Sequence, residues 1–413
     1  MKYTEHSVRH LAFFEALADL RETDAAWRAT TAGLVVLRLI DAWFDEALDP
    51  RTDGAWSMNA VREAVGSIDA GNPARSILSG TLDALEDAPR VSVGAVAPRL
   101  LAYGRSLDYE GQWLLAADVY RSVISRAHPV EDADVAADAH LQLGYCMRTL
   151  GRWDEAAKAY GIAGRIATQA GDIMKVLRAR LSEAKLAIAR GNLPEAESIL
   201  NETIDRAHVN RLPEVRALAM HDRATVAHAR GDFQGAIRFG YDSLRGLTNP
   251  AARDRALSDI AVSFVELGVW SAARDAHLVL AATAQEQYSR WTATLNLLEL
   301  AALDRREPVF EQYRRELIDA ALPPVLEVDY HLYVGEGHRI FGNLDAARAA
   351  LTLALHLATA YKLNQRAFDA EASLRSLDVP VNAPARPMER VPESVQHIAD
   401  AIGHMRDAAG SGV

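Results

Sequence analysis

The sequence has very little cysteine, no excess of basic charge and no long apolar run. Cys146 is the one cysteine among 413 residues, which excludes a disulfide framework and a cysteine-based zinc site. Its position within an amphipathic segment predicts a buried, unreactive thiol. The formal charge of −11 makes nucleic acid an unfavourable main partner, because phosphate binding requires a basic surface.

The most apolar stretch, Gly33 to Ile40, is interrupted by Arg38 and followed by Asp41. It is much shorter than the roughly 20 residues that a membrane-spanning helix needs. The first residues show neither an apolar run nor a cleavage pattern typical of a leader. We therefore expect a soluble cytoplasmic protein that does not contact a membrane.

A short pattern recurs along the chain: a glycine, a large apolar residue two positions later, and an alanine three positions after that. Gly151, Trp153 and Ala156 form one copy, and a small residue, Gly144, stands seven positions before the glycine. Self-similarity of this kind is typical of stacked helix pairs. The first four glycines of the series lie 40 residues apart, and the series runs through Gly111, Gly151, Gly191, Gly231, Gly268 and Gly342, with a degenerate copy at Gly71.

The pattern has a simple physical interpretation. A glycine adopts the left-handed conformation that ends a helix at little cost. A small residue such as Gly144 allows a second helix to approach closely, and we expect Trp153 and Tyr160 to fill the space between the two helices. Around residues 291–320 one more unit is expected, but its turn, between Asp304 and Pro308, has no glycine and no matching alanine. The register is expected to drift there, and a bend in the array of helices is the alternative.

These features predict an all-α solenoid of about six to eight helix pairs in three regions. Residues 1–55 are expected to form a helical cap, with helices over 4–20 and 23–48. Residues 56–378 form the repeat region. Residues 379–413 form a proline-rich linker and an amphipathic helix over 393–408. This last helix would cap the final unit, occupy a groove of its own chain, or bridge a dimer.

The small residue, turn glycine, large apolar residue, alanine and later large residue resemble the tetratricopeptide repeat family over Val96 to Leu377. The unit here is 37 to 40 residues, longer than the usual ~34, and is similar to the long repeats of bacterial signalling proteins such as the maltose-regulon activator and peptide-pheromone-sensing regulators. The resemblance implies a right-handed superhelix whose first helices line a concave groove. It further implies a non-enzymatic adaptor or scaffold that binds a peptide or protein segment.

The register places mostly cationic side chains on the expected groove wall. On an acidic protein such a set would complement a segment that carries acidic groups, and we expect Tyr145, Arg148 and Lys185 to contribute most. Ordinary solvated charges are the alternative. The set comprises Arg105, Tyr145, Arg148, Arg178, Lys185, His221, His228, Arg255, Glu336 and Arg339.

Other chemistry is weakly indicated, so no metal, cofactor or catalytic residue is predicted. Histidines recur at helical spacing as His6 and His10, as His221 and His228, and as His331 and His338, but no catalytic signature accompanies them. The segment 335–342 lacks the preceding strand and the Lys-Ser/Thr pair of a phosphate loop. Two alternative functions remain open: a ligand- or peptide-responsive transcriptional regulator or signalling sensor, and an enzyme with a site at the cap–repeat junction.

Overall fold

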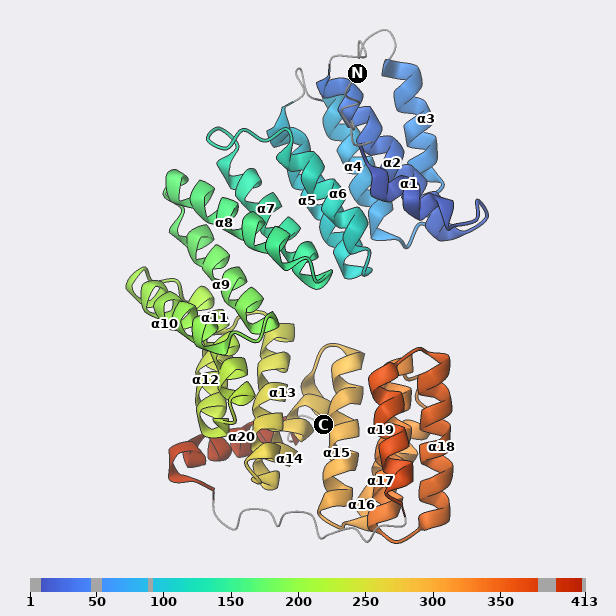
Figure 1. Cartoon of the computed structure of the whole chain (residues 1–413), viewed down its shortest axis with the longest axis vertical. Coiled ribbons are helices and arrows are strands. Elements are labelled where there is room, and N and C mark those ends of the chain that lie inside the picture. The colour runs from blue at the N-terminus through green and yellow to red at the C-terminus, as the bar shows by residue number, and fades with distance from the viewer. Residues whose placement is uncertain (1–8, 46–53, 88–91, 378–390, 411–413) are drawn as a thin grey trace, which may run out of the picture. The chain divides into compact units, whose positions relative to one another are not determined.

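The computed structural model describes residues 9–45, 54–87, 92–377 and 391–410, and every regular element in these ranges is a helix (Figure 1). The helices form two compact units, residues 1–210 and residues 211–413. Consecutive helices from α1 to α10 and from α11 to α19 contact one another. The predicted all-α solenoid is confirmed.

The first unit contains ten of the described helices. The first four belong to the cap and the degenerate pair, and the later ones follow the repeat register. They are α1 (Leu11–Ala18), α2 (Ala25–Phe44), α3 (Gly54–Gly66), α4 (Pro73–Asp87), α5 (Val93–Tyr109), α6 (Trp113–Ile124), α7 (Ala133–Thr149), α8 (Trp153–Ala170), α9 (Ile173–Ala189) and α10 (Leu193–Val209).

The second unit contains the other ten. They are α11 (Pro213–Ala229), α12 (Phe233–Gly246), α13 (Pro250–Glu266), α14 (Trp270–Thr283), α15 (Gln287–Leu303), α16 (Glu307–Ile318), α17 (Pro324–Ile340), α18 (Leu344–Ala360), α19 (Asn364–Arg375) and α20 (Glu393–Gly410). Helices α1 and α2 are shorter than the sequence predicted, because residues 9–10, 19–20, 23–24 and 45 are not helical, while residues 4–8 and 46–48 of the predicted spans lie outside the described residues.

The turn glycines have the predicted left-handed conformation, with the exception of the degenerate copy at Gly71. Gly151 has φ 72°. The N–H of Gly151 donates to the carbonyl of Arg148 at 3.1 Å, and the N–H of Arg152 donates to the carbonyl of Met147 at 2.8 Å. These bonds satisfy carbonyls at the end of α7 that have no partner within the helix. The same left-handed conformation recurs at Gly111, Gly191, Gly231, Gly268 and Gly342.

The close approach of paired helices depends on Gly144 and Tyr160. A Cβ atom at Gly144 would lie 2.3 Å from the Tyr160 ring, and that ring is fully buried. Trp153 does not share this place. Its side chain is 42% exposed, and the guanidinium carbon of Arg190 lies 6.0 Å from its ring centroid. The expectation that Trp153 fills the gap between helices is therefore wrong.

The repeat register does not drift at residues 291–320. Arg305 takes the place of the turn glycine with φ 54°, and the carbonyl of Ala301 accepts the N–H of Arg306 at 2.8 Å, as in the other turns. Phe310 stands where other units have alanine. Its ring occupies the space beside Gly337, where a Cβ atom would lie 2.2 Å away. A glycine in α17 thus accommodates the larger side chain of α16.

The C-terminal helix α20 packs on the second helices α12 and α14. Val395, Ile398 and Ile402 are buried there, and Arg406 Nη1 lies 2.9 Å from Asp275 Oδ1 of α14. Helix α20 therefore does not cap the final helices α17 to α19, and it does not lie on the first helices.

No described helix is long and apolar enough to cross a bilayer.

Candidate functional site: a charged cavity on three neighbouring helices

The first helices α5 to α17 each end two residues before the left-handed turn residue, and their exposed positions vary from repeat to repeat. The position seven residues before each turn is buried throughout, from Gly104 to Gly335. The position six residues before the turn is exposed or half-buried and chemically diverse. We call it the wall position. In chain order it holds Arg105, Tyr145, Lys185, Thr225, Val262, Glu299 and Glu336.

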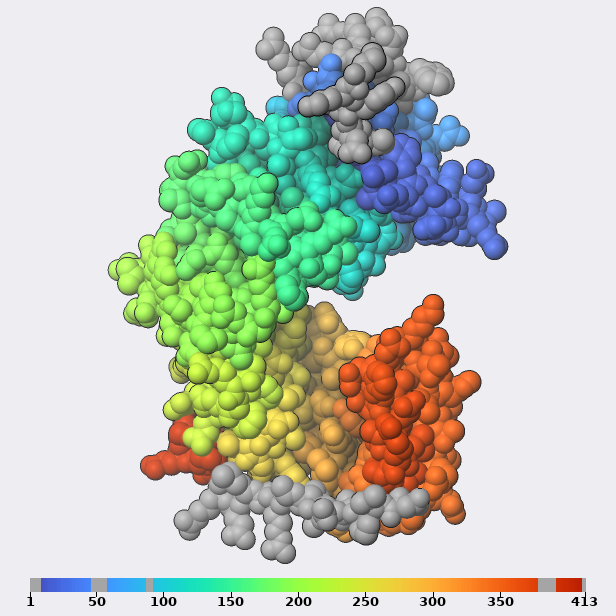
Figure 2. Space-filling model, in the orientation of Figure 1, coloured from blue at the N-terminus to red at the C-terminus, as the bar shows by residue number. Residues whose placement is uncertain are grey.

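A cavity of about 450 Å³ is formed by the first helices α15, α17 and α19 of the second unit. Neighbouring helices of this set contact each other, and Figure 2 shows the surface hollowed beside α19. The cavity holds both wall residues of these repeats. Its polar lining consists of Glu299 from α15, Asp329, Tyr333, Glu336 and Arg339 from α17, and Arg366, Asp369 and Ser373 from α19.

Both arginines of the cavity have partners within it. Arg366 Nε lies 2.5 Å from Asp329 Oδ1, and Arg366 Nη1 lies 3.7 Å from Asp369 Oδ2. Arg339 Nη2 lies 2.6 Å from Glu336 Oε2. The first of these pairs joins α19 to α17, so the positive charges of the lining stabilise the wall itself.

Glu299 differs from the other carboxylates of the cavity. Among the described residues, no cation lies within ion-pair distance of Glu299. Burial, together with the charges of Asp329, Glu266 and Glu336, raises the pKa of this carboxyl to about 7. Burial likewise raises the pKa of Tyr333, with Glu299 as the next contribution. The site therefore contains one carboxylate whose charge lacks compensation.

In the first unit, the predicted residues lie on three first helices. Arg105 is exposed on α5, and Arg178 and Lys185 are exposed on α9. Tyr145 and Arg148 lie together on α7, where the guanidinium carbon of Arg148 is 5.4 Å from the ring centroid of Tyr145. The two exposed positions of α9 and this pair remain a predicted binding surface.

In the second unit, the predicted residues separate into two groups. His221 Nε2 lies 2.8 Å from Asp259 Oδ2, and His228 Nδ1 lies 3.0 Å from Ser263 Oγ, while Arg255 is exposed on α13. Only Glu336 and Arg339 line the charged cavity. The structure thus brings these two residues together and leaves the other three outside the cavity.

Most residues of the cavity were not predicted from the sequence. Glu299 occupies the wall position of its repeat, but this is evident only when Arg305 is recognised as the turn residue. Asp329 stands on α17 at the place that Arg255 holds on α13, and the same register would have found it. Arg366 and Asp369 lie on α19, whose own turn has no repeat signature. No sequence signal identifies them.

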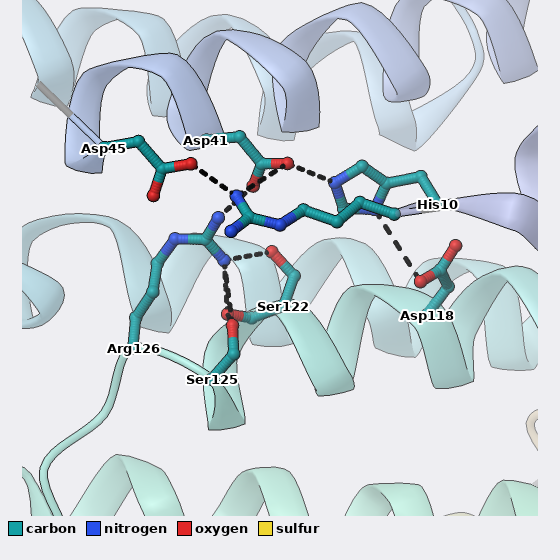
Figure 3. A network of polar contacts seen from close by, with 8 residues as sticks. His10, Asp41, Asp45, Asp118, Ser122, Ser125 and Arg126 are labelled. Carbon is teal, nitrogen blue, oxygen red and sulfur yellow. Dashed lines mark hydrogen bonds and ion pairs between the residues drawn. The ribbon is translucent and has the colours of Figure 1, made fainter. Parts of the chain in front are cut away.

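A second polar cluster lies at the junction of the cap and the repeats (Figure 3). His10 Nε2 lies 3.1 Å from Asp41 Oδ2 of α2, and His10 Nδ1 lies 3.6 Å from Asp118 Oδ1 of α6. Arg126 pairs with the other oxygen of Asp41 and donates to the Ser122 carbonyl at 2.6 Å. These groups neutralise one another, so the cluster is built as an anchor for α1.

None of the described histidines belongs to a group of side chains that is arranged to hold a metal ion. His10 contacts the two aspartates described above, and His6 lies outside the described residues. Within the described ranges, no group of three His, Cys, Asp or Glu side chains is arranged to hold a metal ion. Cys146 is fully buried, and burial raises the pKa of its thiol, as does its hydrogen bond to Asp108.

No family model matches the sequence. The curated proteins contain no match either. Among solved structures, the apo form of RapI is 10% identical, with a TM-score of 0.48, and the match covers 83% of this chain and 98% of that one. The Rap conjugation gene regulator of plasmid pLS20, solved with the Phr* peptide, is 11% identical, with a TM-score of 0.46 and coverage of 86% and 99%. PilF of Pseudomonas aeruginosa is 16% identical, with a TM-score of 0.40 and coverage of 54% and 90%. Identities this low assign no family.

Proposed function

We propose that this protein is a non-enzymatic adaptor that binds a peptide or protein segment on the exposed side of its first helices. The observation that carries the proposal is the cavity on α15, α17 and α19. Its volume of about 450 Å³ lies within the range of ligand sites, roughly 300–1,000 Å³. It is large enough to receive a side chain of a bound segment.

The variation at the wall position supports the same proposal. Buried positions repeat because the packing geometry repeats, as Gly104, Gly144 and Gly335 illustrate. Wall positions are free of that constraint, and adjacent first helices present different chemistry, such as Tyr145 beside Lys185. A segment lying across several first helices would therefore meet a distinct side chain on each helix, which is the basis of selective recognition.

In the first unit, the exposed side of the first helices carries cationic side chains. Arg105, Arg178 and Lys185 are exposed on its first helices, and Arg148 stacks near Tyr145. Arginine and lysine at exposed positions favour carboxylate groups of a partner. We therefore propose that this unit binds acidic side chains of a segment, with Tyr145 as an aromatic contact.

A substitution that fills the cavity tests the adaptor function directly. Ser373 lines the cavity and is half-buried, so a Ser373→Trp side chain would occupy its space without removing a core contact. Peptides selected from a random display library on the purified full chain supply the probe. We expect Ser373→Trp to weaken their binding by at least about tenfold, ~1.4 kcal/mol, in fluorescence-polarisation titrations.

The neighbouring residue provides a matched control. Ala372 is exposed on the same helix and does not line the cavity, so Ala372→Trp adds the same bulk elsewhere. Peptides should bind this variant as they bind the wild type. If no peptide is selected, or if both tryptophan variants bind equally well, the cavity is not the binding site and the proposal fails.

A further inference from the structure

We infer that the cavity on α15, α17 and α19 receives a cationic side chain, lysine or arginine, with the carboxylate of Glu299 as its counter-charge. The inference rests on the proposed function, because it names the chemical class of the group that the adaptor binds there. It differs from the acidic partner expected for the first unit, since the two surfaces carry opposite charge.

The lining of the cavity carries more negative than positive groups. Four carboxylates line the cavity, those of Glu299, Asp329, Glu336 and Asp369, and only two guanidinium groups accompany them. Both arginines already lie against carboxylates at 2.5 and 2.6 Å. An anionic ligand would have to displace one of these pairs, whereas a cationic ligand would add a partner where one is lacking.

Glu299 is on a different helix from both arginines of the cavity. It lies on α15, and the arginines of the cavity lie on α17 and α19, where their partners hold them. The ring of Tyr333 lines the same space, and an aromatic face is a favourable surface for a cation. A ligand ammonium or guanidinium beside Glu299 would thus supply a counter-charge to the only carboxylate of the described lining that has no cation beside it.

The titration of Glu299 gives the interaction a pH signature. The groups around it are Asp329, Tyr333 and Glu336 of α17 and Glu266 of α13, and the lining also contains Arg339 and Arg366. Together with burial, the three carboxylates raise the pKa of Glu299 to about 7. A bound cation favours the ionised form, so binding should release a proton and affinity should rise as the pH increases through 7.

Four capped pentapeptides, Gly-Gly-Xaa-Gly-Gly, serve as probes, with arginine, lysine, citrulline or glutamate at the centre. Citrulline has the shape of arginine without its charge. Titrations of the full chain followed by NMR at pH 8 should show the arginine and lysine peptides binding about tenfold more tightly than citrulline, with glutamate weakest. The Glu299→Gln variant should remove this preference, and the preference should also diminish at pH 6.

Glu316 provides the control, because it is exposed on α16 outside the cavity and Glu316→Gln changes the net charge equally. This variant should retain the preference. Equal binding of the arginine and citrulline peptides, a preference that survives Glu299→Gln, or no binding of any pentapeptide overturns the inference. The adaptor function is judged separately, by the effect of Ser373→Trp on library-selected peptides.

Discussion

His10 is the residue on which the attachment of α1 depends most directly. Its side chain is 4% exposed, and its backbone has φ 61°, a conformation that asparagine and histidine adopt more readily than most residues. Its ring lies between Asp41 of α2 and Asp118 of α6. One side chain therefore joins three helices of the first unit.

This arrangement predicts a pH-dependent stability of the first unit. Burial opposes protonation of His10, but the contacts with Asp118 and Asp41 outweigh it and raise the pKa of His10. A raised pKa in the folded state means that the stabilisation is fully present below the unfolded value of about 6.5. It is lost as the pH rises from there through the folded pKa. Denaturant unfolding of the wild type should therefore show a decline across this window.

The variant His10→Asn tests the assignment, since asparagine tolerates the left-handed backbone. We expect it to lower the free energy of unfolding by about 1–3 kcal/mol at pH 5.5 and to abolish the decline that the wild type shows as the pH rises above about 6.5. Exposed His208 on α10 is the control, because His208→Asn should change neither quantity. A pH profile of His10→Asn that parallels the wild type would contradict the assignment.

At the scale of helices and turns, Arg305 shows how the architecture survives the loss of its marker residue. The helix-ending turn keeps its backbone hydrogen bonds and its positive φ, 54°, without a glycine. A left-handed conformation costs a residue with a Cβ atom roughly 1–2 kcal/mol. Residues of α15 and α16 on either side of this turn, Phe310 among them, are buried in one apolar cluster.

Restoring the glycine should therefore stabilise the protein. We expect Arg305→Gly to raise the free energy of unfolding by about 0.5–1 kcal/mol, because the relief of strain exceeds the added entropy of the unfolded chain. The reverse change at an equivalent turn, Gly268→Arg, where φ is 81°, should lower it by a similar amount or more. Chemical denaturation of the two variants provides the measurement, and a destabilised Arg305→Gly would refute the strain argument.

The sequence predicts the repeat because the constraint is local. A left-handed turn favours glycine, and a close helix contact favours Gly144 opposite Tyr160, so these residues recur at visible spacing. The sequence does not predict how a large side chain on one helix is matched by a small residue on a neighbouring helix. Phe310 is accommodated by Gly337 of the next first helix, and of the two rings expected between the paired helices Tyr160 is buried whereas Trp153 is 42% exposed.

The residues of the cavity, too, could be predicted only in part from the sequence. The register that places Glu336 also places Glu299, but only through a turn that lacks glycine. The pairing of Arg366 with Asp329 depends on how α19 lies against α17, which no periodicity encodes. The docking of α20 on α12 and α14 likewise could not be predicted from periodicity. Its apolar stripe was visible in the sequence, whereas its receiving surface is assembled from two other helices.

At the scale of the whole molecule, the chain divides into two units that each contain apolar clusters of their own. One cluster of the first unit extends from Phe13 to Leu186. In the second unit, three clusters cover the residues from Ala217 to Ile402, and one of them includes the buried face of α20. The cavity and all its ion pairs lie within residues 211–413.

This division predicts that residues 211–413 fold and bind by themselves. Solenoid stability arises mainly between neighbouring elements, and every helix that lines or supports the cavity is present in this fragment. Circular dichroism should show a helical fragment with cooperative unfolding. Its affinity for the arginine-centred pentapeptide should match that of the full chain within about threefold, ~0.7 kcal/mol, and Glu299→Gln should reduce it equally in both. A folded fragment without this binding would show that the cavity alone does not form the site.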